Sequence, residues 1–192
     1  MEKILITGTG RCGTTFLIKL FSFLDFNTGY NRDNYELSIS SNCNSGMERS
    51  YNDNFNVLKN PTFIMDIENI SKDTSITIKN VIIPIRDLKT SAKSRVKHGK
   101  ENGGLWNAED ELSQIDFFKN ILTNYIFIST KYDIKTIFID FDKMINDKTY
   151  LFNKFKNILD EKNIDLETFS SVYDEVSLSS KPKNILDEKI LL

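Results

Sequence analysis

Short apolar runs alternate with longer amphipathic segments along this chain. Four runs predict buried strands, because they are rich in β-branched and apolar residues and are bounded by glycine, proline or charged residues. They cover residues 4–7, 55–58, 77–85 and 135–141. The run at 77–85 holds an unbroken apolar core, which is typical of a central strand in a parallel sheet.

Helical spacing of apolar residues separates these runs. It predicts helices at residues 14–26, 88–97, 108–131, 142–145 and 150–159, with a mixed pattern at 62–70. This alternation predicts one α/β domain over residues 1–192, with a central, mostly parallel sheet flanked by helices. Residues 30–56 are polar and lack periodicity, which favours a variable substrate loop, and residues 177–192 form a tail that matches no pattern.

Composition and charge argue against several classes of protein. The net charge of -2 offers no general basic surface for nucleic acid. The two cysteines, Cys12 and Cys43, are too few for a disulfide framework. The amino terminus lacks the pattern of a signal peptide, and no apolar run approaches the length of a membrane span, so we expect a cytoplasmic protein.

Glycine is concentrated after the first predicted strand. Gly8, Gly10 and Gly13 stand within six residues of one another, and the helical pattern begins at Thr14. A strand, a glycine-rich turn and a helix N-terminus together direct backbone N–H groups toward an anion. We therefore predict a phosphate-binding loop, against the alternative that the glycines form only a turn.

This loop departs from the Walker pattern of ATP-binding proteins. The position of the Walker lysine holds Thr14, whereas the hydroxyl that follows it is present as Thr15. A basic residue stands three positions earlier, as Arg11. Cys12 is either a thiol activated by the helix N-terminus or, as we favour, a small residue that fits a tight loop.

A second anion site is predicted after the strand at 77–85. Arg86 follows this strand directly, and Ser94 and Arg95 come about two turns into the next helix. An arginine fork and a hydroxyl that face one crevice can bind a phosphate. Taken alone, this segment favours the other interpretation, a strand-end arginine that pairs with Asp87 or a surface carboxylate.

Three segments together resemble the sulfotransferases that use 3′-phosphoadenosine 5′-phosphosulfate (PAPS). Residues 11–16, Arg-Cys-Gly-Thr-Thr-Phe, are similar to the loop that binds the 5′-phosphosulfate in that family. Arg86-Asp87 with Ser94 is similar to its 3′-phosphate site, and residues 137–147 resemble its later strand–helix segment. Lys59-Asn60-Pro61 is similar to a Lys-x-Pro element of its carbohydrate branch.

The resemblance implies a three-layer, P-loop-like fold and transfer of a sulfuryl group from PAPS to an acceptor hydroxyl, on a carbohydrate or another small molecule. PAPS, or the product 3′-phosphoadenosine 5′-phosphate (PAP), would bind without a metal ion. Arg86 and Ser94 would hold the 3′-phosphate, and Arg11 would neutralise charge on the bridging oxygen. The 5′-phosphate would be held by the loop residues Gly10, Arg11, Cys12, Gly13, Thr14 and Thr15.

The residues that act on the acceptor are less defined. Lys59 is expected near the transferred group, against the alternative of an exposed lysine beside a turn. Glu48 and Glu36 are candidate general bases within residues 30–56, with Glu48 favoured, and the competing interpretation of each is a solvated loop charge. The only histidine, His98, follows the second anion site, and we interpret it as an exposed residue at a helix end.

Two other functions stay open. A P-loop kinase would need the absent Walker lysine, although Asp140 stands at a strand end where it could hold a metal. A nucleotide-binding module without catalysis would fit the short chain and the poorly placed base. Trp106 is either a core residue or part of the adenine or acceptor pocket.

Overall fold

Four parallel strands form the central sheet of this computed structural model, which describes residues 1–40, 45–97 and 104–180. The strands are β1 (Glu2–Ile6), β2 (Val57–Lys59), β3 (Thr77–Ile85) and β4 (Thr136–Asp140). Their order in the sheet is β2-β1-β3-β4, and every neighbouring pair is parallel. All four carboxyl ends therefore lie at one edge of the sheet, where parallel α/β proteins bind their ligands.

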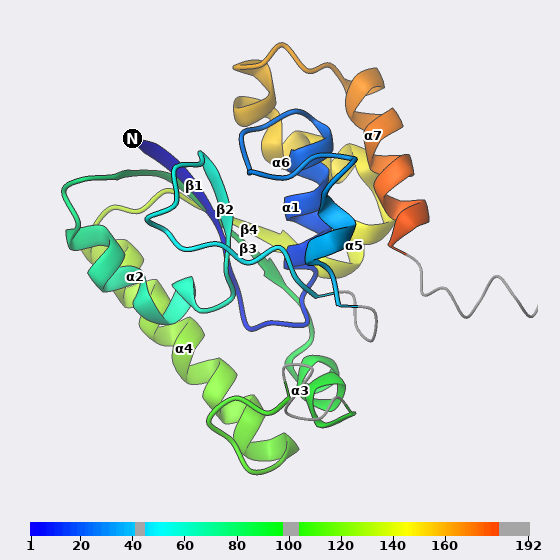
Figure 1. Cartoon of the computed structure of the whole chain (residues 1–192). Helices are drawn as coiled ribbons and strands as arrows, with labels where there is room; N and C mark the ends of the chain where they lie inside the picture. Colours follow the sequence, from blue (N-terminus) through cyan, green and yellow to red (C-terminus); the bar gives the residue numbers. More distant parts are fainter. Residues whose placement is uncertain (41–44, 98–103, 181–192) are drawn as a thin grey trace, which may run out of the picture.

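Helices cover both faces of the sheet and produce three layers (Figure 1). One face carries α2 (Phe63–Lys72) and α4 (Glu111–Lys131), and the other carries α1 (Thr14–Phe23), α6 (Lys148–Asp160) and α7 (Leu166–Ser179). The shorter elements are η1 (Tyr35–Ser38), α3 (Leu88–Lys97) and α5 (Phe141–Asn146). The predicted α/β class, with helices on both sides of a parallel sheet, is confirmed.

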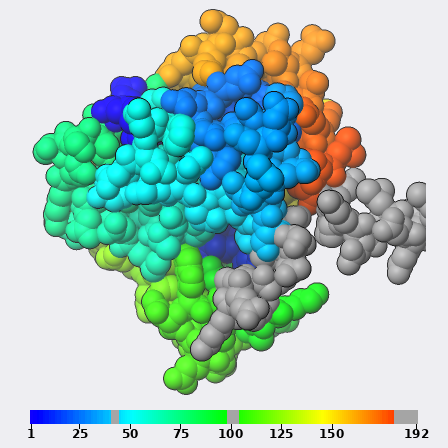
Figure 2. All heavy atoms as spheres, viewed as in Figure 1, coloured from blue at the N-terminus to red at the C-terminus, as the bar shows by residue number. Residues whose placement is uncertain are grey.

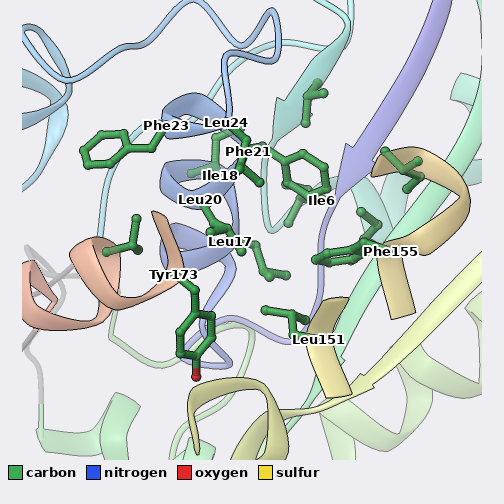
Figure 3. Packing of buried hydrophobic residues seen from close by; sticks show 14 of the residues in the cluster. Ile6, Leu17, Ile18, Leu20, Phe21, Phe23, Leu24, Leu151, Phe155 and Tyr173 are labelled. Atoms are coloured by element: carbon green, nitrogen blue, oxygen red, sulfur yellow. The ribbon is translucent and has the colours of Figure 1, made fainter. Parts of the chain in front are cut away.

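The core on the α1 side fixes this helix against the sheet. Leu17, Leu20 and Phe21 of α1 are buried and face side chains from β1 and the carboxyl-terminal helices (Figure 3). The ring centroids of Phe21 and Phe155 are 5.1 Å apart. Burial of each such side chain contributes roughly 1.5–3 kcal/mol, so the position of the α1 N-terminus is set by the core.

One helix is absent from the sequence prediction. α7 buries Phe169, Val172, Tyr173 and Val176, which are spaced as one face of a helix. Its start is marked by Asp165, whose carboxylate accepts a hydrogen bond from the backbone N–H of Thr168. Both signals are present in the sequence, so the prediction that contains no helix at 166–179 is wrong there.

The other predicted elements are present, some with the predicted bounds and some with shifted ends. The strand at 77–85 and the helix at 88–97 have the predicted bounds. The helix predicted from 108 begins at Glu111, because Asp110 and Ser113 form reciprocal capping hydrogen bonds there. In the described part of the chain, no helix is long and apolar enough to cross a bilayer.

Residues 30–40 and 45–56 are irregular apart from η1 and a bridge between Ile39 and Gly46. The ammonium group of Lys3 donates hydrogen bonds to the carbonyl oxygens of Asp53 and Phe55, which tie this segment to β1. Residues 41–44 of the predicted substrate loop lie outside the described residues. In the predicted tail, residues 177–179 form the end of α7, Ser180 caps it, and residues 181–192 lie outside the described residues.

Candidate anion-binding site

The glycine-rich loop joins β1 to α1 at the carboxyl edge of the sheet. Thr7 anchors its start, because its N–H donates to Ile82 O at 3.0 Å and its hydroxyl donates to Pro61 O at 3.1 Å. The same hydroxyl accepts a hydrogen bond from the N–H of Ile64. In Figure 2, dark-blue atoms of the amino-terminal part are visible between the cyan and green segments.

Two glycines combine a left-handed backbone conformation with close neighbouring side chains. Gly10 has a φ of +73°, and a Cβ atom there would lie 2.1 Å from Nη2 of Arg95. Gly13 has a φ of +86°, and its Cβ would lie 2.4 Å from Cε of Met144. A side chain is disfavoured at both positions, because L residues rarely adopt this left-handed backbone conformation.

The N-terminus of α1 carries no side-chain cap. Gly13 occupies the capping position, and the first turn contains no acidic residue. The helices α4, α5, α6 and α7, by contrast, each begin with a capping aspartate. The first-turn N–H groups of α1, including those of Thr14 and Thr15, have no intrahelical acceptor and are suited to an anion.

Arg11 lies in this loop with a φ of +56°. Its Nε and Nη2 atoms are buried and have no hydrogen-bond partner in the described part of the chain. Burying guanidinium nitrogens without an acceptor costs free energy, because they lose their hydration. An anion within reach of these nitrogens would supply the missing acceptors.

Cys12 is completely buried behind the loop. Burial raises the pKa of its thiol, which opposes formation of a reactive thiolate. A Cβ on Gly8 would lie 2.8 Å from the sulfur, so the thiol fills a tight space. These observations favour the interpretation of Cys12 as a small residue of the loop.

The predicted second anion site lies directly beside the first. Arg86 follows β3 and donates a hydrogen bond from Nη1 to the carbonyl oxygen of Arg11, at 3.0 Å. Its guanidinium also lies over the ring of Phe141, 4.5 Å from the centroid. Ser94 is half-buried in α3, and no hydrogen bond joins it to Arg86 among the described residues. The contact of Phe141 with Arg86 is one that the sequence did not predict.

Lys59 and Glu48 are brought together at the end of β2. Lys59 is paired in the sheet with Ile6, the last residue of β1, which places it next to the start of the loop. Its buried ammonium forms an ion pair with Glu48 and donates to Gly46 O at 3.0 Å. Burial lowers the pKa of Lys59, and the negative charge of Glu48 opposes this shift.

Glu36 is not part of this cluster. Its carboxylate accepts a hydrogen bond from the Tyr35 hydroxyl at 3.0 Å. Its charge acts on Lys19 in the second turn of α1, where burial is the larger effect and lowers the lysine pKa. No hydrogen bond between Glu36 and the glycine loop is found within residues 1–40, 45–97 and 104–180.

The other candidates have different positions. Trp106 is half-buried, and its ring lies under the Arg95 guanidinium, 4.0 Å from the charged carbon. His98 lies outside the described residues. Asp140, the possible metal ligand of a kinase, uses its carboxylate to cap α5 by accepting from Lys143 N.

No family model, no curated protein and no solved structure matches this chain. The arrangement of the residues themselves therefore carries the functional argument.

Proposed function

We propose that this protein is a cytoplasmic sulfotransferase that moves a sulfuryl group from PAPS to an acceptor hydroxyl, on a carbohydrate or another small molecule. The observation that carries the proposal is the hydrogen bond from Arg86 to the carbonyl of Arg11. It brings the two basic segments, which resemble the two phosphate sites of PAPS-dependent enzymes, against each other. Under this proposal, a nucleotide with phosphates at both its 5′ and 3′ positions would bind better than ATP.

Binding of the 5′-phosphosulfate would use the loop and the start of α1. The backbone N–H groups from Gly10 to Thr15 and the hydroxyls of Thr14 and Thr15 would hold the 5′-phosphate. Arg11 would contribute the Nε and Nη2 atoms that lack partners in the described structure. Arg86 would take the 3′-phosphate, and Ser94 would bind the same phosphate with its hydroxyl.

In the transfer step, the acceptor oxygen forms a bond to sulfur while the bond from sulfur to the bridging phosphate oxygen breaks. The negative charge that develops on this bridging oxygen would be stabilised by Arg11. Glu48 would accept the proton of the acceptor hydroxyl, and Lys59 would orient the Glu48 carboxylate and add positive charge near the transferred group.

An open hollow of about 530 Å³ adjoins this pair and offers a place for the acceptor. Its lining includes Glu48, Tyr51, Asn60 and Thr62. Hydroxyl, amide and aromatic groups of this kind suit a polar ring compound such as a sugar. Glu48 pairs with Lys59 and also lines the hollow, so under this proposal it would lie between the acceptor and the donor loop.

One observation favours the alternative of a nucleotide-binding module without catalysis. The carboxylate of Glu48, our candidate base, is already bound to the Lys59 ammonium. Such a module would bind PAP and would transfer no sulfuryl group from PAPS to any acceptor.

The test is calorimetric titration with PAP and with ATP-magnesium, on the wild type and on Arg86→Ala. We expect PAP to bind more tightly than ATP-magnesium and Arg86→Ala to remove this preference. Arg32→Ala is the matched control, because Arg32 pairs with Glu175 on α7, away from the loop. Tighter binding of ATP-magnesium to the wild type would refute the proposal. If PAP binds more tightly, an assay with labelled PAPS and a panel of sugars separates an enzyme from an inactive module.

A further inference from the structure

Arg95 is a buried cation placed behind the glycine loop. It lies on the inner face of α3, and 3% of its surface is exposed. Nη2 donates to Thr9 O at 3.3 Å, and Nη1 donates to Gly104 O at 2.6 Å. The guanidinium thereby joins the loop to the segment that follows α3.

The loop rests directly on this guanidinium. A Cβ on Gly10 would clash with Nη2 of Arg95, so the backbone of Gly10 is in close contact with the charged group. Burial, followed by the nearby charge of Arg11, lowers the pKa of Arg95 to about 10. Arg95 therefore stays charged near neutral pH and adds positive potential beside the backbone of the glycine loop.

Trp106 packs against the Arg95 guanidinium. The centroid of its ring lies 4.0 Å from the guanidinium carbon, in the geometry of a cation–π interaction. The backbone of Trp106 is fixed to α4 by the buried Gln114, whose Oε1 accepts from Trp106 N at 2.6 Å. A continuous set of contacts thus runs from α4 through Trp106 and Arg95 to Thr9, two residues before Arg11.

We propose that Arg95 is a positioning residue for the 5′-phosphosulfate: it holds the Thr9–Arg11 backbone against α4 and supports anion binding through its charge, and Trp106 senses that binding. This inference rests on the proposed function, because it assumes that the loop binds the 5′ group of PAP. The role differs from that of Arg86, which we assign to the 3′-phosphate.

Binding of two different nucleotides distinguishes the role of Arg95 from that of Arg86. PAP carries phosphates at both ends, whereas adenosine 3′-phosphate lacks the 5′ group. We expect Arg95→Met to weaken PAP binding about tenfold or more, the loss expected when a charge-assisted contact is removed. The same variant should bind adenosine 3′-phosphate as the wild type does. Arg95→Lys should bind PAP with intermediate affinity, since an ammonium keeps the charge and cannot reach both carbonyl oxygens in the same geometry.

The inference would be overturned if Arg95→Met bound PAP like the wild type. It would also be overturned if the variant lost affinity for PAP and for adenosine 3′-phosphate by the same factor. Should Arg95→Met fail to fold, the emission of Trp106, the only tryptophan of the chain, decides the matter in the wild type. A saturable change with PAP and none with adenosine 3′-phosphate supports the inference, and unchanged emission at saturating PAP overturns it. Wild-type protein that does not bind PAP in calorimetry refutes the proposed function itself, which separates the two failures.

Discussion

The buried ammonium of Lys59 pairs with a carboxylate of Glu48 whose side chain is 43% exposed, whereas that of Lys59 is 1% exposed. The two partners therefore depend on each other unequally. Without Lys59, the Glu48 carboxylate can be hydrated by bulk water. Without the charge of Glu48, the ammonium stays buried and keeps Gly46 O as its remaining acceptor among the described residues.

This asymmetry predicts that Glu48→Gln destabilises the fold more than Lys59→Met. The first change leaves a buried charge with a neutral partner, at a cost of about 1–3 kcal/mol. The second replaces a buried ion by an apolar chain of similar volume, which is often close to neutral. Urea unfolding of both variants measures the difference, and the reverse order would show that Lys59 is held by packing rather than by its partner. Under the proposed function, both variants lose sulfuryl transfer.

Arg11 is expected to cost stability in the free protein and to provide it in the complex. Arg11→Met should leave the free protein as stable as the wild type or more so, because two unsatisfied buried nitrogens are removed. PAP at a hundred times its Kd should stabilise the wild type by about 2.7 kcal/mol and this variant far less. Thermal unfolding with and without PAP is the measurement. Arg32→Met should respond to PAP like the wild type, and a full response of Arg11→Met would remove Arg11 from the site.

Gly13→Ala should both destabilise the fold and weaken PAP binding. The left-handed backbone alone costs a non-glycine residue roughly 1–2 kcal/mol, and the new Cβ would also meet Met144 and Phe141. A double-mutant cycle with Met144→Ala separates the two causes, since only the steric part should be recovered in the double variant. Strictly additive effects in urea unfolding would mean that the backbone conformation accounts for the whole cost.

Acid should weaken the starts of the helices that aspartates cap. Hydrogen bonds from the N–H groups of Ser113 and Thr168 lower the pKa of Asp110 and Asp165 below the ordinary value of 3.8. A carboxyl with a lowered folded pKa contributes fully above its unfolded pKa, and this contribution is lost as the pH falls through the folded value. The unfolding temperature should therefore drop below about pH 5.

Asp165→Asn tests this assignment, because asparagine caps a helix without titrating. Its unfolding temperature should fall less steeply with acid than that of the wild type. Asp116→Asn, within α4 and outside any cap, is the control and should follow the wild type. Identical pH profiles for all three proteins would assign the acid sensitivity to other carboxylates.

Local patterns in the sequence determined most of the secondary structure and the existence of the loop. The strand at 77–85 is recognisable because nearly every residue in its second half is apolar, and the loop because three glycines follow a short apolar run. These signals depend only on neighbours along the chain. The spacing of Phe169, Val172, Tyr173 and Val176 is a signal of the same kind, and it was sufficient to indicate α7.

The tertiary structure alone decided which charged groups meet. The strand order β2-β1-β3-β4 brings Lys59 and Arg86 to opposite sides of the β1 loop, although they are 53 and 80 residues away from Ile6 along the chain. Tertiary packing also pairs Glu48 with Lys59 while Glu36 bonds to Tyr35, and it places Arg95 against Gly10. Such contacts depend on sheet order and side-chain packing between distant segments, and no local pattern of apolar and polar residues encodes them.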